Sequence, residues 1–255
     1  MYLIGDIGNS ETKFCILNDN FNIIKRLSSD TSKINNLFFK NKIYPFIKNK
    51  KINNKVLFSS VVPSVFSLIE KNLKKKFNFK IHEVKKTEYS KLIKINVNKK
   101  QIGSDRIANA VGVYKKYKSN CIVLDFGTAT TFDVVTKSGI YNGGVIAPGV
   151  NLSINSLSSL ADQIPTFSLK RQKRVIGKNT IEALYSGFYW GYSGLINNII
   201  LKIEKETKKK HKIIFTGGYA DLFKTSIIRP FVVDKNITIK GIIEIFKKNE
   251  SSLIK

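Results

Sequence analysis

The sequence predicts an α/β protein made of two similar domains, and the first reason is a strand–turn–strand unit that occurs twice. In each copy an apolar run ends in an aspartate, one residue separates this aspartate from a glycine, and a second strand-like run follows. The aspartates are Asp6 and Asp125, and the glycines are Gly8 and Gly127. Because the repeat recurs after about half of the chain length, we expect two like domains that face each other.

The order of the elements in the first part of the chain is the second reason. Apolar and β-branched runs predict three strands, a helix and a fourth strand, which is the order of a ribonuclease-H-like half-domain. The Pro63-Ser64 pair then suits the start of a helix, with Ser64 as a cap. The predicted elements are a hairpin over 1–17, a strand over 21–28, a helix over 31–42, a strand over 56–62, a helix over 63–75 and a strand over 79–84.

The remaining elements follow a polar connection that reaches Lys100. The span 138–161 has no charged side chain, which indicates burial, an interface, or both. We divide the chain into domains at 1–117 and 118–255, with the terminal helix as a candidate to pack back on the first domain. The expected elements are a helix over 107–117, the second hairpin over 121–136, a basic loop over 168–178, a long helix over 181–203, a strand over 212–216 that leads into Gly217-Gly218 and a helix, and a terminal helix over 241–248.

Composition limits the classes of protein to consider. With 255 residues, 42% of them hydrophobic, the chain can form a substantial core. No apolar run reaches the roughly 18 residues of a membrane span, and no basic segment precedes an apolar run at the N-terminus, so we expect a cytoplasmic protein without a signal peptide. Cys15 and Cys121 fall in predicted strands and are expected to be small buried side chains. With only His82 and His211, a histidine-rich metal site or a histidine-based triad is not expected.

The formal net charge of +26 raises the question of nucleic-acid binding. The lysines, however, are spread over segments such as 48–55, 71–100 and 202–212 and do not follow one stripe. A dispersed lysine surface binds nucleic acid nonspecifically at low salt. We therefore expect no specific nucleic-acid function, and we expect the charge to help attract an anionic substrate.

The two aspartate turns are the strongest candidates for chemistry. A carboxylate at the end of a buried strand is costly unless a cation or a hydrogen-bond donor meets it. Facing each other across a cleft, the turns at Asp6 and Asp125 could hold a polyphosphate and its metal. The alternative is that each aspartate only stabilises its own turn.

Three further features have both a functional and a structural interpretation. Asp105 stands at a helix start between Gly103 and Arg106, where it can cap the helix or serve a hydroxyl beside a phosphate. Thr180 is most simply the cap of the long helix. The glycine-rich segments 143–149 and 216–218 let a backbone approach a ligand, yet they also suit tight turns.

Several common nucleotide and hydrolase motifs are absent. Gly177-Lys178 lacks the upstream glycine of a Walker A loop and is followed by Asn179. No G-x-G-x-x-G segment opens a helix after a strand, and no G-x-S-x-G elbow occurs. A P-loop, a dinucleotide site and an α/β-hydrolase site are therefore not supported.

The motifs together resemble the type III pantothenate kinases. They are DIGNS at 6–10 with Lys13, SSVVP at 59–63, GSDRIANAV at 103–111, LDFGTATTFD at 124–133, GGVIAPG at 143–149, IGKNTIEAL at 176–184 and TGG at 216–218. Their order and spacing extend over nearly the whole chain. The resemblance implies the actin-like ATPase superfold, with duplicated ribonuclease-H-like domains and an active-site cleft between them.

The resemblance also implies residue roles. Asp105 would be the general base on the terminal hydroxyl of pantothenate, Thr128 would meet ATP, and Asp125 would ligate a monovalent cation, K⁺ or NH₄⁺. Asp6 would lie near Mg²⁺. The first phosphate loop would comprise Asp6, Ile7, Gly8, Asn9, Ser10, Glu11, Thr12 and Lys13, and the pantothenate site would comprise Asn96, Gly103, Ser104, Asp105, Arg106 and Thr180, the last near the interface of a homodimer.

The implied activity is ATP-dependent phosphorylation of pantothenate to 4′-phosphopantothenate, the first step of coenzyme A biosynthesis. A hydroxyl that attacks the γ-phosphorus needs alignment and charge neutralisation more than a strong base. The sequence departs from the family pattern at two positions, where Asn96 and Lys99 replace the usual Tyr and Pro. Because the family's Tyr lines the pantothenate site, this departure concerns the affinity for pantothenate. A non-catalytic, ATP-binding regulatory relative of the same fold is the alternative, and a nucleic-acid-binding protein is the third hypothesis.

Overall fold

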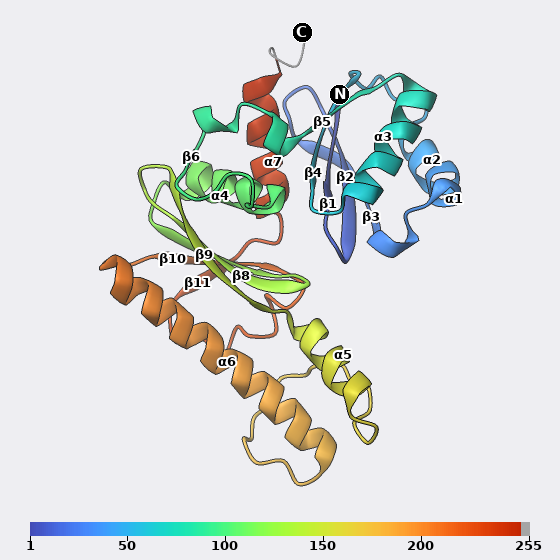
Figure 1. Cartoon of the computed structure of the whole chain (residues 1–255). Helices are drawn as coiled ribbons and strands as arrows, with labels where there is room; N and C mark the ends of the chain where they lie inside the picture. Colours follow the sequence, from blue (N-terminus) through green and yellow to red (C-terminus); the bar gives the residue numbers. More distant parts are fainter. Residues whose placement is uncertain (251–255) are drawn as a thin grey trace. The chain divides into compact units, whose positions relative to one another are not determined.

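A computed structural model describes residues 1–250 (Figure 1), and the last five residues of the predicted second domain, 251–255, lie outside the described part of the chain. The contacts divide the chain into two compact units. Among the described residues, the first unit comprises Met1–Lys118, Gly139–Tyr141 and 236–250, and the second comprises Ser119–Ser138 and Asn142–Lys235. The terminal helix therefore groups with the N-terminal part of the chain.

The first unit contains a five-stranded sheet in the order β3-β2-β1-β4-β5. The pairs β1–β2 and β2–β3 are antiparallel, and the pairs β1–β4 and β4–β5 are parallel. The carboxyl ends of β1, β4 and β5 consequently lie at one edge of this sheet. The strands are β1 Tyr2–Ile7, β2 Glu11–Leu17, β3 Ile23–Asp30, β4 Lys55–Ser60 and β5 Lys80–Glu83.

The second sheet repeats this topology, and most of its strands belong to the second unit, whereas β6 and the start of β9 belong to the first. The order of this sheet is β11-β10-β7-β8-β9-β6, in which β7 pairs with β8 antiparallel and with β10 parallel, and β10 pairs with β11 parallel. Read from β9, the order is third, second, first, fourth and fifth strand, as in the first sheet, and β6 is added at the edge through Ile140 and Tyr141. The strands are β6 Lys94–Ile95, β7 Cys121–Phe126, β8 Ala129–Val135, β9 Ile140–Pro148, β10 Lys212–Gly217 and β11 Phe231–Val233. The predicted duplicated ribonuclease-H-like fold is thus confirmed.

The helices cover apolar cores in both units. In the first unit β1, β2 and β4 pack against α3 around Ile7, Phe14 and Phe58, which are fully buried. In the second unit the core joins β7, β10 and α6 around Leu124, Phe215 and Ile196. The α-helices are α1 Asn36–Phe38, α2 Tyr44–Ile47, α3 Pro63–Phe77, α4 Ser104–Tyr117, α5 Val150–Leu160, α6 Thr180–Thr207 and α7 Ile237–Asn249.

Three expectations from the sequence need correction. The helix predicted over 31–42 starts later, because residues 31–33 form a 3-10 turn and the side chain of Asn35 accepts a hydrogen bond from the Phe38 N–H at the start of a new helix; helical structure then runs from Asn36 to Ile47, with a π-helical segment at Phe39–Ile43. No helix follows Gly217-Gly218, where the chain forms turns closed by the Leu222 and Ser226 N–H groups. The helix predicted over 63–75 is present as α3, but Ser64 is not its cap, because Val62 occupies the cap position and no side chain bonds the first turn.

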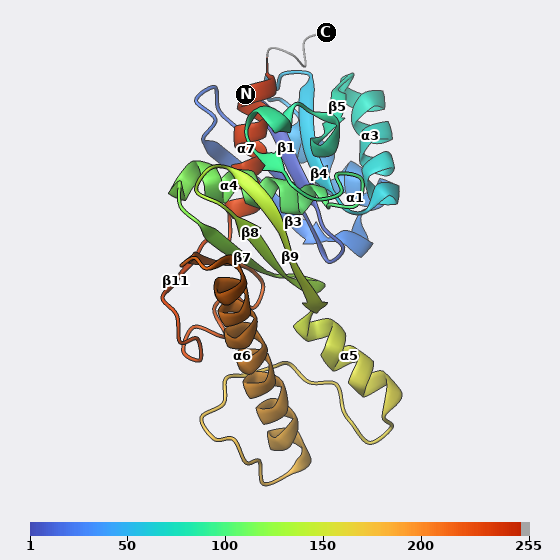
Figure 2. The ribbon, with the colours of Figure 1, turned by 60° about the vertical axis from the view of Figure 1, so that its left-hand side comes forward.

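The uncharged span 138–161 is only partly buried within its own chain, where Tyr141, Val150 and Ile154 are buried. It comprises β9 and helix α5, and α5 lies next to the long α6 in Figures 1 and 2. Ile146 is 64% exposed and Leu160 is 86% exposed. Within residues 1–250, none of the helices combines the length and the apolar character that a bilayer crossing requires.

Helices α4 and α7 approach each other closely in the first unit. A Cβ added to Gly241 of α7 would overlap the carbonyl oxygen of Ala108 in α4. The two helices are also joined by the hydrogen bond that Thr238 Oγ1 donates to Asn109 Oδ1, at 2.7 Å. Glycine at position 241 is therefore what allows this contact.

We expect Gly241→Ala to lower the free energy of unfolding by about 1–3 kcal/mol, because the methyl group forces the two helices apart. Gly194→Ala is the matched control, since a Cβ at this helical position meets nothing within 4 Å. The control should be neutral or stabilising by up to about 1 kcal/mol. Urea denaturation measures both variants, and equal effects of the two would contradict the proposed contact.

Candidate active site

The turn after β1 presents a polar tip at the sheet edge. Asp6, the second-last residue of β1, lies opposite Lys13 of β2 and Ser59 of β4. The turn is closed by the Gly8 N–H, which donates to the carbonyl oxygen of Glu11 at 3.0 Å. Asn9, Ser10 and Glu11 are exposed at its tip.

This turn is supported from below by Thr31 and Thr12. Thr31 Oγ1 donates to the Gly8 carbonyl oxygen at 2.6 Å and lies 2.9 Å from Thr12 Oγ1, and the Thr31 N–H donates to the Ser10 carbonyl oxygen at 2.9 Å. The side chains of Thr12 and Ile7 are completely buried, so they stabilise the turn and cannot reach a ligand. Lys13 Nζ lies 3.1 Å from Glu11 Oε2, which partly neutralises the lysine.

The start of α4 lies beside the same turn. The Val61 N–H, directly after β4, donates to the carbonyl oxygen of Ile7 at 3.0 Å. A Cβ added to Gly103 would lie 3.4 Å from Val61 Cγ1 and would overlap Asp105 Oδ1. Val61 and Gly103 thus link the end of β1 to Asp105, and glycine at position 103 leaves space for the Asp105 carboxylate.

Asp105 is a first-turn residue and not the cap of α4. The cap position is occupied by Gly103, without a side-chain hydrogen bond. Asp105 Oδ1 accepts the Arg106 N–H at 2.8 Å. Burial raises the pKa of the Asp105 carboxyl above its usual value, and the Arg106 hydrogen bond opposes this increase. The Arg106 guanidinium lies 5.8 Å from the centre of the Tyr141 ring.

Two other residues predicted to bind the substrate differ in their exposure to solvent. Ser104 is completely buried, and its hydroxyl donates to Glu83 Oε1. Asn96 follows β6 and is exposed, and its N–H donates to the Tyr141 carbonyl oxygen at 3.0 Å. The sequence analysis did not single out Glu83, because nothing in the sequence connects it with Ser104.

The turn after β7 holds Asp125 in the second unit. Asp125 lies opposite Thr131 of β8 and Thr216 of β10. Gly217 has a φ of +83°, and a Cβ at this position would lie 2.7 Å from Asp125 Oδ1 and 2.6 Å from the Phe126 nitrogen. Glycine is therefore required beside the Asp125 carboxylate. Thr128 is exposed at the tip of this turn.

The two turns match beyond their first two strands. The Ile7 carbonyl oxygen accepts the Val61 N–H at 3.0 Å, and the Phe126 carbonyl oxygen accepts the Gly218 N–H at the same distance. The equivalence therefore extends to the ends of β4 and β10. The two turns differ in length. In the second turn the Gly127 N–H donates to the Ala129 carbonyl oxygen at 3.1 Å, so this turn is one residue shorter than the first.

The acidic residues of these turns do not belong to larger metal-binding clusters. Among residues 1–250, no three His, Cys, Asp or Glu side chains gather into a group that could hold a metal ion. A single carboxylate suits Mg²⁺ that keeps waters and takes its remaining ligands from substrate phosphates. At Asp125, the close approach of the Gly217 backbone leaves a carboxylate among backbone groups, and oxygen ligands of this kind suit a hard cation.

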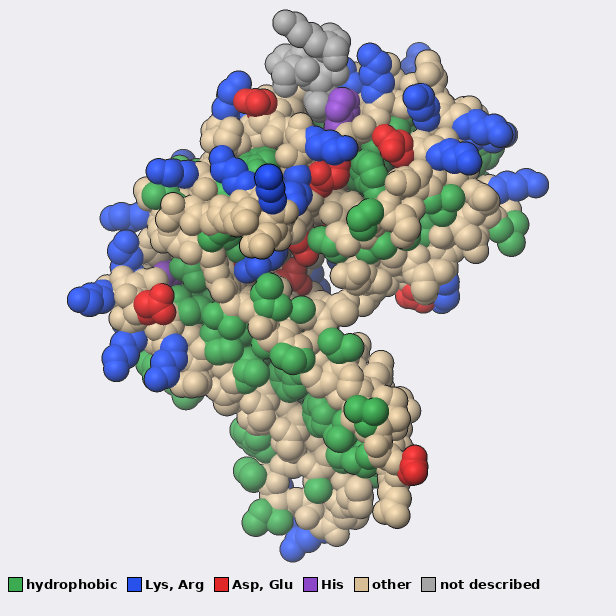
Figure 3. Space-filling model, in the orientation of Figure 1, with side chains coloured by type: hydrophobic (Ala, Val, Ile, Leu, Met, Phe, Trp, Pro, Cys, Tyr) green, Lys and Arg blue, Asp and Glu red, His purple; other side chains and the backbone are tan. Residues whose placement is uncertain are grey.

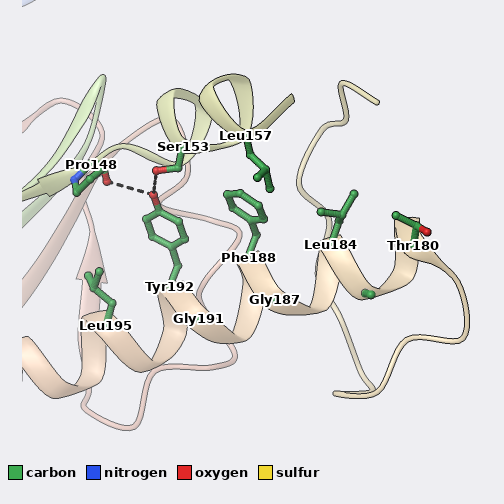
Figure 4. A pocket seen from close by; sticks show the side chains of 11 residues that line it. Pro148, Ser153, Leu157, Thr180, Leu184, Gly187, Phe188, Gly191, Tyr192 and Leu195 are labelled. Atoms are coloured by element: carbon green, nitrogen blue, oxygen red, sulfur yellow. Dashed lines mark hydrogen bonds between the residues drawn. The ribbon is translucent and has the colours of Figure 1, made fainter. Parts of the chain in front are cut away.

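A cavity of about 630 Å³ lies between α5 and α6, with Thr180 at one end (Figure 4). Thr180 is the first helical residue and not the cap, because Asn179 Oδ1 accepts the Glu182 N–H at 2.9 Å. The Tyr192 hydroxyl lies 2.7 Å from Ser153 Oγ and donates to the Pro148 carbonyl oxygen at 3.2 Å. Leu157, Leu184, Phe188 and Leu195 make the rest of the lining mostly apolar.

The surface agrees with a dispersed positive charge. On the face that Figure 3 shows, Lys and Arg side chains are scattered, and apolar side chains gather over α5 and α6. Exposed apolar residues of this region include Leu152, Leu157 and Leu160. The distinctive feature of this face is therefore an exposed apolar patch over α5 and α6, and not a stripe of basic residues.

Comparison with known proteins identifies close relatives. The family model described as type III pantothenate kinase matches residues 2–202. A type III pantothenate kinase from Pelagibacter ubique (strain HTCC1062) is 53% identical over 244 residues, covering 95% of this chain and 97% of that protein. One from Geotalea daltonii (strain DSM 22248 / JCM 15807 / FRC-32) is 33% identical and covers 99% of this chain and 100% of that protein.

Solved structures share the fold at low sequence identity. A conserved Campylobacter jejuni protein assigned to the Baf family of transcriptional activators has a TM-score of 0.61 and 23% identity, covering 98% of this chain and 99% of that one. The activator of the 2-hydroxyisocaproyl-CoA dehydratase from Clostridium difficile, with bound ADPNP, has a TM-score of 0.57 and 11% identity, covering 98% and 96%. These likenesses show the fold alone.

The raised pKa of Asp105 predicts how this residue affects stability. An ordinary aspartate has a pKa of about 3.9 in the unfolded chain, and the folded value is higher. Stability contributed by this group is therefore lost as the pH rises through the window between the two values, and the loss persists at neutral pH. We expect Asp105→Asn to melt at a higher temperature than the unmodified protein at pH 7, with the difference disappearing near pH 4.

Asp162→Asn is the control for this measurement, since Asp162 is exposed. Its melting temperature should stay unchanged at both pH values. A lower melting temperature of Asp105→Asn at pH 7 would show that the carboxylate stabilises the fold, contrary to the expectation.

Proposed function

Because this chain belongs to the type III pantothenate kinase family and is a pantothenate kinase, we propose that Asp105 is its general base and that the turn after β1 binds the phosphates of ATP. The enzyme converts pantothenate to 4′-phosphopantothenate, the first step of coenzyme A biosynthesis. The observation that carries the proposal is the link from Ile7 through Val61 to Gly103, which puts the Asp105 helix start beside the β1 turn.

The phosphate loop is proposed to work mainly through its backbone and its exposed tip. Ile7, Gly8, Glu11 and Thr12 shape the turn, whereas Asn9 and Ser10 present an amide and a hydroxyl at the surface. Lys13 adds a positive charge, and its ammonium group would interact with phosphate oxygens as well as with the Glu11 carboxylate. Thr128, exposed at the tip of the second turn, is the proposed additional contact to ATP.

Asp105 is suited to accept a proton from the pantothenate hydroxyl. Its pKa is raised by burial, which makes the carboxylate a stronger base than an exposed aspartate. The hydroxyl loses its proton to Asp105 while its oxygen forms a bond to the γ-phosphorus and the bond to ADP breaks. Gly103 and Arg106 flank the base, and Asn96 and Thr180 are proposed to contact the remainder of pantothenate.

Two cations are proposed to assist the transfer. Asp6 would hold Mg²⁺ together with the ATP phosphates, and Asp125 would hold K⁺ or NH₄⁺. These cations supply positive charge against the charge on the transferring phosphoryl group. The residues fit such ions, because Asp6 lies one residue before the end of β1, next to the exposed loop, and the backbone of Gly217 closely approaches Asp125.

We also propose that the enzyme is a cytoplasmic homodimer that associates through α5 and α6. The apolar lining of the α5–α6 cavity and the exposed Leu152, Leu157 and Leu160 form a surface that a second copy could cover. Thr180, at the end of this cavity, would then lie near the subunit interface.

Replacement of the base tests the catalytic assignment. We expect Asp105→Asn to lower kcat by about 10²–10⁴-fold, because no group remains to take the proton, while ATP binding persists. A coupled phosphorylation assay with pantothenate, run with and without potassium, measures kcat, and titration with ATP measures binding. A wild-type kcat in the variant would remove Asp105 from this role, and the absence of product from the folded unmodified protein would favour the regulatory alternative.

The pH dependence gives a second test of the same residue. The base acts only when deprotonated, and its pKa is raised in the folded protein. We therefore expect kcat to fall as the pH decreases through a value above the ordinary aspartate pKa of about 3.9. Asp162→Asn should keep this profile, and a profile without an acidic limb above pH 4 would contradict the assignment.

A charge in the apolar surface tests the dimer. We expect Leu157→Glu to lower the mass measured by sedimentation to that of a monomer, because an unpaired carboxylate would be buried at the interface. Ile24→Glu is the control, because Ile24 is exposed on β3 in the first unit. The control should remain dimeric, and an unchanged mass for Leu157→Glu would place the interface elsewhere.

A further inference from the structure

Glu83 joins three structural elements at the edge of the first sheet. It is the last residue of β5, and its two carboxylate oxygens have different partners. Oε1 accepts the hydroxyl of Ser104, the first residue of α4. Oε2 accepts the Lys85 N–H at 2.9 Å and so caps the short 3-10 helix Val84–Lys86. One side chain therefore fixes β5, this 3-10 turn and the start of α4 to one another.

Ser104 uses its hydroxyl for this attachment. The residue is completely buried, so its side chain has no access to a ligand. Its backbone leads directly into Asp105, and the Asp105 carboxylate has its own contacts with the Arg106 N–H and the space left by Gly103. Any movement of Ser104 would consequently be transmitted to Asp105.

A carboxylate is a costly choice at this position. Burial raises the pKa of Glu83, and the Ser104 hydrogen bond is the largest of the interactions that oppose the increase. A buried acid stabilises a fold less than a well-packed apolar residue unless its hydrogen bonds serve a specific arrangement. In this protein the hydrogen bonds of Glu83 fix the position of the first turn of α4.

The body of α4 does not depend on this attachment. Ile107, Ala108 and Val111 are completely buried, and Asn109 accepts the Thr238 hydroxyl of α7 at 2.7 Å. Loss of the Glu83–Ser104 hydrogen bond should therefore leave the helix in place and loosen only its first turn. That turn contains Asp105.

We propose that Glu83 is a positioning residue for phosphoryl transfer: through the buried hydroxyl of Ser104 it fixes the direction in which Asp105 meets the acceptor hydroxyl. This inference rests on the proposed role of Asp105 as the base. In the same way Ser104 acts through its attachment to Glu83 and not through contact with pantothenate. A misplacement of about 1 Å in a reacting group can lower the rate by about 10²-fold, so the effect should appear in kcat.

The test compares Glu83→Ala, Ser104→Ala, the double variant and Glu83→Gln. We expect each alanine variant to lower kcat by about 10–100-fold with an unchanged KM for ATP. The double variant should lose no more than either single variant, because both remove the same hydrogen bond. Glu83→Gln keeps an acceptor for Ser104 and should retain kcat to within about threefold, the effect of weakening one hydrogen bond.

Glu88→Ala is the matched control, because Glu88 is the next acidic residue along the chain and pairs with Lys91 at the surface. It should keep the unmodified kcat. A wild-type kcat in Ser104→Ala, or losses that multiply in the double variant, would overturn the proposal. If Glu83→Ala fails to fold, Ser104→Ala and Glu83→Gln still decide the question.

The Asp105→Asn variant separates failure of this inference from failure of the proposed function. If Asp105→Asn is inactive while Ser104→Ala is fully active, only the positioning role is wrong. If Asp105→Asn is fully active, the assignment of the base itself is wrong, whatever the Glu83 variants do.

Discussion

The parallel pairing of β1 with β4, and of β4 with β5, is the constraint on which the proposed catalytic arrangement depends. It brings the ends of three strands, at Ile7, Ser60 and Glu83, to one edge of the first sheet. Helix α4 starts at this edge because Ser104 bonds to Glu83 and Gly103 packs against Val61. Polar residues gather there because the strand ends leave backbone groups and loops free of the apolar core.

The second unit uses the same topology with different chemistry. Its aspartate also occupies the second-last position of the first strand, and the carbonyl oxygen that follows again accepts an N–H from beyond the fourth strand. Here Gly217 approaches the carboxylate, whereas Ser59 lies opposite the aspartate of the first unit. A common backbone pattern therefore carries two distinct environments for a carboxylate.

The sequence predicted the features that depend on local pattern. The strands were recognisable because short apolar runs end at glycine or proline, and Asp105 was recognisable at a helix start. The Glu83–Ser104 hydrogen bond was not, because the two residues are 21 positions apart and meet only when β5 and α4 are folded. Asn35 and Asn179 were missed for a related reason, since a cap is one of several uses of an asparagine, and only the backbone geometry selects it.

The unequal length of the two aspartate turns bears on how the halves of this protein diverged. If both arose from one ancestral gene segment, the copy at Gly127, closed by Ala129, has become shorter and presents the exposed Thr128 where the first turn presents Asn9 and Ser10. A ligand that binds the exposed residues of the longer turn would therefore not find the same contacts at the shorter turn. The internal symmetry of the backbone is therefore not matched by symmetry in the polar groups that the two turns expose.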